Sequence, residues 1–303
     1  MKASVICPTY NGGPTFVKCL NTLLSQKVNY PYEIIIVDSS SNDGTAEFLQ
    51  SKSATHKNLH FHSIPQSEFG HGKTRNLAIS LATGEFIAVI TQDAIPQGDS
   101  WLKVIVGDLE RHPDAAGAFG RHIAYPESGP IVEHEIDSHF KQFGKTSKAY
   151  LIESKERFET DTGYRQFLHF FSDNNACIRR SVWEKIPYPE IEFGEDQVWA
   201  KTFLEAGYLK VWSPHAVVMH SHCFGFRETL MRSYEESKFF KRHFGYKLGK
   251  SFPLVILRAY RETIKDFRTL QKREGLQAKW KWLIKGALNN LAKTLGHYIG
   301  TSR

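Results

Sequence analysis

The sequence predicts an α/β fold in which a doubly wound, mostly parallel sheet is followed by a basic helical extension. Short unbroken apolar runs alternate with amphipathic helical patterns over roughly the first hundred residues, as strands and helices do in a parallel sheet. Polar and glycine-rich segments follow these runs directly, at the strand ends where open α/β sheets bind ligands. Beyond residue 226 the pattern is helical almost to the end of the chain.

The alternating part begins with a strand at residues 4–7 and a helix at 16–25, in which Phe16, Cys19 and Leu20 share one face. Residues 33–37 form an unbroken run rich in β-branched side chains, which is typical of a buried parallel strand. The elements expected next are a turn at 42–45 that starts a helix, a strand at 59–64, a helix at 72–82 and a strand at 86–91.

The second part of the chain is less regular. Residues 120–171 are weakly patterned, and we interpret them as long loops with short helices. The elements expected after this segment are helices at 181–186 and 196–206, a strand at 211–219, and a helical region broken near Phe252-Pro253.

Charge divides the chain into two regions. The segment from Thr229 to the end has 17 Lys and Arg against 5 Asp and Glu, a net charge of +12, whereas the rest has 22 against 27, a net charge of −5. Basic tails of this kind bind nucleic acid, anionic membranes or acidic polymers, and the charge alone leaves the partner open. We therefore predict a globular domain over residues 1–226 and a basic helical region over 227–303.

Two polar segments follow the first two strands. Pro8-Thr9-Tyr10-Asn11-Gly12-Gly13 lets the backbone approach a ligand closely, although it has no GxGxxG dinucleotide fingerprint and could be a plain turn. Asp38 ends the second apolar run, where its carboxylate can accept a hydrogen bond from the imide N–H of a uracil or thymine ring. The alternative is a turn-forming Asp, a role that Asp43 fits better because it precedes Gly44.

Acids also follow the fourth strand and begin a later helix. An acid such as Asp93 directly after a buried strand loses hydration unless it meets a cation, so it suggests a divalent metal beside a diphosphate. The alternative is a solvated loop residue. Glu195-Asp196 could be a general base with a supporting carboxylate, or acids that stabilise a helix N-terminus.

Two histidines follow the last predicted strand. His220 and His222 are two residues apart, so in an extended chain they point to the same side. Imidazoles placed in this way could complete a metal site, although a structural role is equally compatible with the pattern.

Taken together, these segments resemble glycosyltransferase family 2, whose members have the GT-A fold. Pro8-Thr9-Tyr10-Asn11 resembles the family's first-strand motif, and residues 38–45 its nucleotide-base motif. Gly72-Lys73-Thr74-Arg75-Asn76 resembles the stretch that leads to its metal motif, and Glu195-Asp196 its catalytic acids. The resemblance covers about residues 3–225.

The metal motif departs from the usual Asp-x-Asp of the family. Thr91 stands at the first position and only Asp93 keeps the carboxylate, which makes a histidine ligand more useful. Thr91-Gln92-Asp93-Ala94-Ile95-Pro96 is similar to the version in bacterial rhamnosyltransferases of this family. Phe119-Gly120-Arg121 and His220-Ser221-His222 resemble that subgroup as well.

The resemblance implies an inverting, single-displacement transfer. Asp196 would remove the proton from the acceptor hydroxyl, Glu195 would orient it or bind the acceptor, and a divalent metal, Mg²⁺ or Mn²⁺, would offset the charge of the departing diphosphate. Arg75 would add a second cation there. The expected metal ligands are Asp93 and His220 or His222, and the residues expected to contact donor sugar or acceptor are Asp173 and Asn174. The expected nucleotide contacts are Pro8, Thr9, Tyr10, Asn11, Asp38, Ser39, Gly72, Arg75 and Gln92.

The resemblance also implies the substrates. The donor would be dTDP-L-rhamnose, with a UDP-sugar as the alternative, and the acceptor a lipid-linked glycan of a bacterial surface polysaccharide such as O-antigen. Two rival classes are a nucleotidyltransferase, which would usually carry a Gly-rich basic loop after the first strand, and a non-catalytic membrane- or polymer-binding module.

The basic region suits a location in the cytoplasm, peripheral on the inner face of the bacterial cytoplasmic membrane. An apolar helical stripe runs through Trp280, Leu283, Ile284, Ala287, Leu288, Leu291 and Leu295. Such a stripe can lie in the interface of an anionic membrane, or it can pack on the domain or join copies in a homo-oligomer. We expect no nucleic-acid partner.

Overall fold

The computed structural model describes residues 1–249, 251–272 and 279–302. The chain forms two compact units. The first unit comprises Met1–Ile123 and Phe140–His220, and the second comprises Ala124–His139 and Ser221–Arg303. The second unit thus begins a few residues before the boundary expected from the charge pattern, and it takes in a segment from the middle of the chain.

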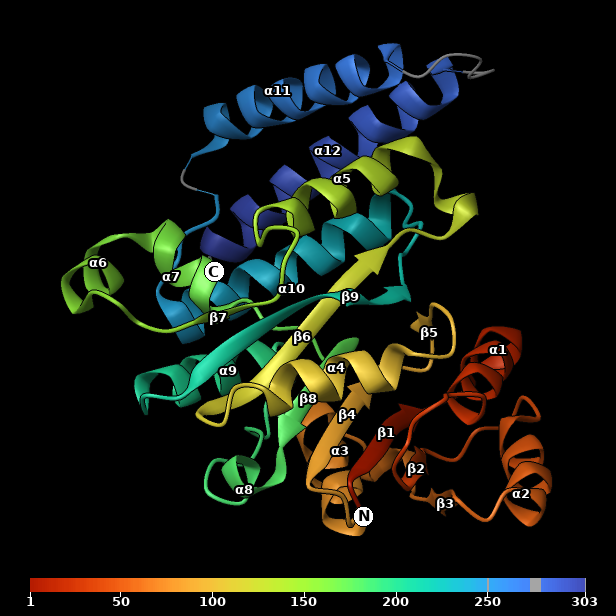
Figure 1. Ribbon diagram of the computed structural model, residues 1–303. Helices are drawn as coiled ribbons and strands as arrows, with labels where there is room; N and C mark the ends of the chain where they lie inside the picture. Colours follow the sequence, from red (N-terminus) through yellow and green to blue (C-terminus); the bar gives the residue numbers. More distant parts are fainter. Residues whose placement is uncertain (250, 273–278, 303) are drawn as a thin grey trace. The chain divides into compact units, whose positions relative to one another are not determined.

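The described residues of the first unit form a nine-stranded sheet with the order β3-β2-β1-β4-β8-β6-β9-β5, in which β7 also pairs with β9 (Figure 1). The strands are β1 (Ala3–Thr9), β2 (Tyr32–Asp38), β3 (Leu59–Ser63), β4 (Phe86–Ile90), β5 (Ile95–Pro96), β6 (Ala115–Ile123), β7 (Lys148–Tyr150), β8 (Asn175–Arg179) and β9 (Leu209–Met219).

The parallel half of the sheet is the part that the sequence predicts most directly. Strands β3, β2, β1 and β4 are parallel neighbours, and their apolar residues are buried on both faces. The chain passes from β1 to β2 and β3 on one side, and then returns to β4 on the other side of β1. The loops after β1 and β4 therefore meet at the switch point of the sheet, where such folds bind ligands.

The other half of the sheet is mixed. Strand β8 is antiparallel to both β4 and β6, whereas β6 and β9 run parallel. The segment expected to be mainly loop contains the end of β6, the strand β7, the 3-10 helix η2 (Pro126–Ser128) and three α-helices. The pattern of β6 was weak because small residues replace large apolar ones, and at Gly120 a side chain would lie 2.3 Å from the Ala216 carbonyl oxygen.

Helices cover the sheet of the first unit. Helix α1 buries Phe16, Cys19, Leu20 and Leu23, the face expected from its periodicity. The helices are α1 (Gly13–Leu24), α2 (Thr45–Thr55), α3 (His71–Leu81), α4 (Trp101–Glu110), α6 (Lys155–Thr160), α7 (Thr162–His169), α8 (Arg180–Trp183) and α9 (Glu195–Glu205), with short 3-10 helices at η1 (Gln66–Glu68) and, in the second unit, η2 (Pro126–Ser128).

The second unit is helical. It contains α10 (Phe226–Phe244), α11 (Phe252–Gln271), α12 (Lys279–Ser302) and most of α5 (Gly129–Lys141) (Figure 1). Pro253 lies in the first turn of α11, where a backbone N–H would have no partner within the helix. The break expected in the helical region therefore falls just before α11. Among the described helices, none is both long enough and apolar enough to cross a bilayer.

Helix α12 buries small residues rather than its apolar stripe. A side chain at Gly296 or Gly300 would lie 2.4 Å from a carbonyl oxygen of α10, so the two helices pack closely only because these positions are glycine. This packing leaves Trp280, Ile284 and Leu288 at the surface, with exposed fractions of 72%, 61% and 49%.

Candidate active site

The loops that follow β1 and β2 are tied to each other. Thr9 and Asp38 are register partners at the ends of these strands, and Asp38 is fully buried. One Asp38 oxygen accepts from the Ser41 hydroxyl and the other from the Ser41 backbone N–H at 3.0 Å. The Asn11 amide oxygen accepts from the Asn42 N–H at 2.9 Å. Asp38 therefore shapes the turn, and its contact with a donor base stays a prediction.

Gln92 joins the loop after β4 to the loop after β1. Its Oε1 accepts from the Thr9 hydroxyl at 2.7 Å and from the Tyr10 N–H at 2.8 Å, and its Nε2 donates to the Tyr10 carbonyl at 3.1 Å. This amide fixes the Pro8-Thr9-Tyr10 segment at the switch point. Ser39 belongs to the same group, because its N–H donates to the Thr9 carbonyl at 2.9 Å.

The pairing of β5 with β9 brings Asp93 close to His220, because Ile95 is the register partner of Met219. The His220 Nε2 lies 3.5 Å from Asp93 Oδ2. The Asn174 side-chain nitrogen lies 3.3 Å from the other ring nitrogen, Nδ1, and the Asn174 oxygen accepts from the Thr91 hydroxyl at 3.4 Å. Asn174 therefore turns the ring so that Nε2 faces the carboxylate, the kind of outer contact that orients metal-binding histidines.

Thr91 thus has a role although it lacks the carboxylate usual at its position. Its hydroxyl supports Asn174, which in turn supports His220. His222 lies two residues beyond His220, in the second unit. Its part in a metal site stays a prediction.

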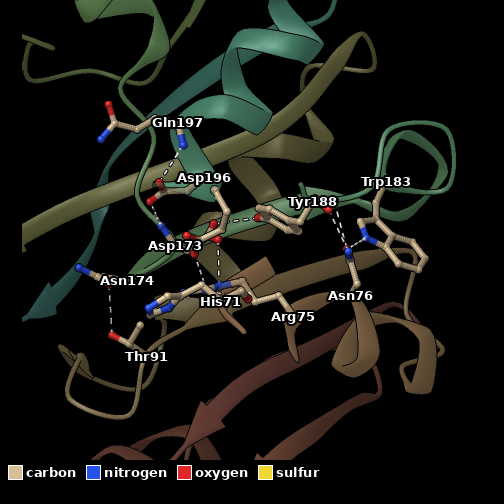
Figure 2. A network of polar contacts seen from close by, with 11 residues as sticks. His71, Arg75, Asn76, Thr91, Asp173, Asn174, Trp183, Tyr188, Asp196 and Gln197 are labelled. Carbon is tan, nitrogen blue, oxygen red and sulfur yellow. Dashed lines mark hydrogen bonds and ion pairs between the residues drawn. The ribbon is translucent and has the colours of Figure 1, made fainter. Parts of the chain in front are cut away.

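The second group of polar residues surrounds the start of α9 (Figure 2). Gly194, with φ at +71°, precedes the helix, and Glu195 and Asp196 form its first turn. Arg75, from α3, is almost completely buried; its Nη1 donates to Glu195 at 2.5 Å and its Nε lies 2.9 Å from Asp173 Oδ2. One guanidinium is therefore held between two buried carboxylates, and Asp196 lies beside them.

Asp173 connects the parts of this group. Its other oxygen, Oδ1, accepts from the Tyr188 hydroxyl at 2.8 Å, and its backbone N–H donates to Asp196 Oδ2 at 3.3 Å. Asp173 and Asn174 are consecutive residues just before β8. The same short segment thus contacts Asp196 with one residue and His220 with the next.

The surroundings of Asp196 and Asp173 raise the pKa of both side chains. Burial, together with the negative charges of Glu195 and Asp173, raises the pKa of Asp196 well above its ordinary value, although Arg75 opposes this shift. Burial raises the pKa of Asp173 to about 7, against the opposing effect of Arg75. A carboxylate with a raised pKa is a stronger proton acceptor than an ordinary aspartate.

The sequence did not single out Tyr188, Asn76 or Trp183. The Asn76 amide donates to the Tyr188 carbonyl at 2.9 Å and accepts from the Trp183 indole at 2.8 Å, so these residues hold the loop that carries Tyr188 (Figure 2). Only its hydrogen bond to Asp173, which the structure reveals, marks the buried Tyr188 as part of the site. Gly72 is required by packing, because a side chain there would lie 2.0 Å from the Pro189 carbonyl oxygen.

Comparison with known proteins identifies the relatives. The model of glycosyl transferase family 2 matches residues 4–187, which is more than half of the chain. The O-antigen chain rhamnosyltransferase RfbN of Salmonella typhimurium strain LT2 is 29% identical, covering 99% of this chain and 90% of its own. The O-antigen chain rhamnosyltransferase WbaN of Salmonella anatum is 28% identical, covering 98% and 88%.

Solved structures agree on the fold. The mannosyltransferase PcManGT from Pyrobaculum calidifontis, in complex with GDP-Man and Mn²⁺, matches with a TM-score of 0.60 at 19% identity, covering 98% of this chain and 84% of its own. Residues 1–349 of Staphylococcus aureus TarS, in complex with UDP-GlcNAc, match with a TM-score of 0.57 at 18% identity, covering 94% and 79%. The chain belongs to glycosyl transferase family 2, has the GT-A fold, and is a glycosyltransferase related to the O-antigen rhamnosyltransferases.

Proposed function

We propose that this enzyme transfers L-rhamnose from dTDP-L-rhamnose to a hydroxyl of a lipid-linked surface polysaccharide, with inversion at the anomeric carbon. The observation that carries the proposal is the similarity to two O-antigen chain rhamnosyltransferases over nearly the whole chain. The buried acid group at the start of α9 supports it, because a single displacement needs one base at the acceptor hydroxyl.

Asp196 is the proposed base. It is less buried than Glu195, and its raised pKa makes it a stronger proton acceptor. The acceptor oxygen would attack the anomeric carbon as its proton passes to Asp196, and the bond from that carbon to the diphosphate would break. Glu195 is engaged by Arg75, so in this proposal it positions the group rather than taking the proton.

In this proposal, one nitrogen of the Arg75 guanidinium binds a phosphate. Its Nη1 and Nε face carboxylates, whereas its Nη2 donates no hydrogen bond within the part of the chain that the structure describes. Nη2 is therefore the atom with which Arg75 would contact the diphosphate. The guanidinium would otherwise hold Asp173 and Glu195 in place.

Asp93 and His220 fit a divalent metal. They offer one carboxylate oxygen and one imidazole nitrogen that already converge, and Asn174 fixes the ring. Oxygen donors suit Mg²⁺ and Mn²⁺, and an imidazole is acceptable to the softer of the two. When bound, the ion would offset negative charge on the departing diphosphate. His222, two residues from His220, is the proposed third ligand.

The donor nucleotide is proposed to lie across the ends of β1 and β2. Gln92 holds the backbone of Thr9 and Tyr10 in a fixed position there, and Asn11 ties this segment to the turn after Asp38. A thymine or uracil ring carries an imide N–H that a buried carboxylate such as Asp38 can accept. Pro8, Ser39 and Gly72 remain expected neighbours of the nucleotide.

The second unit is proposed to bring the enzyme to an anionic membrane surface, on the inner face of the cytoplasmic membrane where its lipid-linked acceptor would lie. Two helices each expose large apolar residues four positions apart, and therefore on one face. These residues are Phe252, Ile256 and Tyr260 on α11, and Trp280, Ile284 and Leu288 on α12. Helix α11 also exposes the basic side chains Arg258, Arg261, Lys265 and Arg268.

Apolar and basic side chains on the same helix are typical of an interfacial helix. The same apolar faces could instead join two copies of the chain. Measuring the mass of the protein in solution, with and without anionic liposomes, separates these alternatives.

A donor panel tests the proposed reaction. The purified enzyme is incubated with dTDP-L-rhamnose, UDP-sugars and GDP-mannose without acceptor, and the release of nucleoside diphosphate is measured. We expect slow hydrolysis with dTDP-L-rhamnose above all others. Preferred hydrolysis of a UDP-sugar would favour the alternative donor class, and preferred hydrolysis of GDP-mannose would contradict the role given to Asp38.

A further inference from the structure

The second unit contains a cavity of about 260 Å³, and His222 is the one lining residue to which the proposed reaction gives a role. Its walls come from α5, α10, α11 and α12 and from the segment His222-Cys223-Phe224. All of its lining residues belong to the second unit, so the cavity is a feature of that unit alone. Its volume is just below the range of pockets that hold drug-sized ligands, so it would take a small molecule or one residue of a polymer.

Several side chains around the cavity have acceptor oxygens that are not used in hydrogen bonds to described residues. Asp266 is buried and its Oδ2 accepts from the Asn290 amide at 2.7 Å. The Asn289 amide donates to the Phe224 carbonyl at 3.1 Å. Over the residues that the structure describes, Asp266 Oδ1 and the amide oxygens of Asn289 and Asn290 accept no hydrogen bond. The lining residues thus include three with acceptor oxygens that accept no hydrogen bond from described residues, and Lys285, whose ammonium is a donor.

The charges around the cavity are mixed. Arg232, Lys285 and Lys293 are basic, whereas Glu135, Glu236 and Asp266 are acidic. A phosphate would meet three carboxylates, and an apolar molecule would leave the polar atoms unsatisfied. The ligand that matches such a lining is neutral and carries several groups that both donate and accept, which is the chemistry of a sugar's hydroxyls.

Aromatic rings complete the lining. Trp282 lies against Gly129, where a side chain would be only 2.3 Å from the indole, so the ring fits there because this position is glycine. The Arg232 guanidinium lies over the Phe224 ring at 4.8 Å from its centroid. Arg232 and His222 both lie against the Phe224 ring, so the Trp282 indole is the aromatic surface of the lining that would meet the apolar C–H face of a pyranose.

We propose that this cavity is a sugar-binding subsite that holds one residue of the acceptor glycan, apart from the residue that receives the transferred sugar. Its lining includes His222, which follows His220 by two residues along the chain. A polymeric acceptor held at a second point would be presented repeatedly to the same base. This inference rests on the proposed glycan acceptor.

Two pairs of variants test the subsite. Thr229→Trp fills the cavity from the first turn of α10, and Arg227→Trp adds the same side chain at an exposed position on that turn outside the cavity. Lys285→Ala removes a lining cation, and Lys281→Ala removes an exposed one from the same helix. Binding of methyl glycosides of hexoses and 6-deoxyhexoses is measured by ligand-observed NMR, with inorganic diphosphate as a competitor.

We expect the wild type and both controls to bind at least one methyl glycoside. Thr229→Trp should bind it at least about tenfold more weakly because the added side chain fills the cavity. Lys285→Ala should bind it at least about tenfold more weakly because a charged hydrogen bond is lost. Equal binding by all variants, no binding by the wild type, or displacement by diphosphate would overturn the subsite. Hydrolysis of the sugar nucleotide is measured on the same samples. Glycoside binding without any donor hydrolysis would refute the proposed reaction and leave the subsite standing.

Discussion

Arg75→Met is the substitution that tests the organisation of the active site most directly. The side chain is almost fully buried and pairs with Asp173 and Glu195, while Asp196 lies in the same group. Methionine fills a similar volume but carries no charge. The variant therefore leaves three neighbouring carboxyl groups with no cation between them.

The magnitude follows from this charge balance. Removing one partner of a buried pair typically costs about 3–5 kcal/mol, because the remaining charge is left uncompensated. A unit of this size loses roughly 2–4 °C of Tm per kcal/mol, so Tm should fall by roughly 6–20 °C near neutral pH. Protonating the acids relieves the repulsion, so the loss should depend on pH.

The sign of the pH dependence is set by Asp173. Its pKa is raised to about 7 in the folded protein, so its contribution to stability is present at low pH and is lost as pH rises toward 7. Without Arg75 its pKa should rise further. The Tm difference between wild type and variant should therefore be small near pH 5 and largest above pH 7.

Thermal unfolding of both proteins from pH 5 to pH 9 measures this difference. Lys73→Met is the matched control, because Lys73 is exposed on the same helix. Adding Glu195→Gln to Arg75→Met should recover part of the stability. A Tm difference that is constant with pH, or no difference from the Lys73→Met control, would refute the proposed charge balance.

Three further predictions concern the reaction and the surface. Asp196→Asn should lower kcat by about 10²–10⁴-fold with unchanged affinity for dTDP in calorimetry, and the wild-type kcat should rise with pH through the raised pKa of Asp196; a variant that keeps most of its turnover would exclude it as the base. Asp93→Ala should raise the Mn²⁺ or Mg²⁺ concentration for half-maximal activity by at least about tenfold, and full activity of the wild type in chelator would remove the metal from the proposal. Ile284→Glu with Leu288→Glu should reduce co-sedimentation with anionic liposomes at low salt and leave Tm unchanged, because both side chains are exposed; a sharp fall in Tm would mean that they are packed instead.

Much of the first unit could be predicted from local sequence. Its parallel strands are unbroken apolar runs, and a polar residue that ends such a run lies at the ligand-binding edge of the sheet. Asp38 and Asp93 were predicted as site residues in this way, and Glu195-Asp196 from its place at a helix start; their roles stay predictions. The mixed half of the sheet was harder, because β6 is made of small residues that give little hydrophobic pattern.

The apolar stripe of α12 shows the limit of periodicity. The repeat predicted which residues share a face, but it did not predict whether that face is buried. Close packing on α10 requires Gly296 and Gly300 at the contact, so the glycine face is buried and Trp280 and Ile284 remain exposed. The distance between α10 and α12, which depends on the side chains of both helices, decided which face of α12 is buried.

The sequence by itself determined the order of strands and helices in the parallel half of the sheet, the family resemblance and the acids at the strand ends, because these depend on neighbours along the chain. Only the tertiary structure decided how the acids are paired. Arg75 and Glu195 are separated by 120 positions, and Tyr188 meets Asp173 only after the sheet has formed. A buried charge pairs with the group that the fold places within hydrogen-bonding distance, and the residues next to it in the sequence do not predict which group that is.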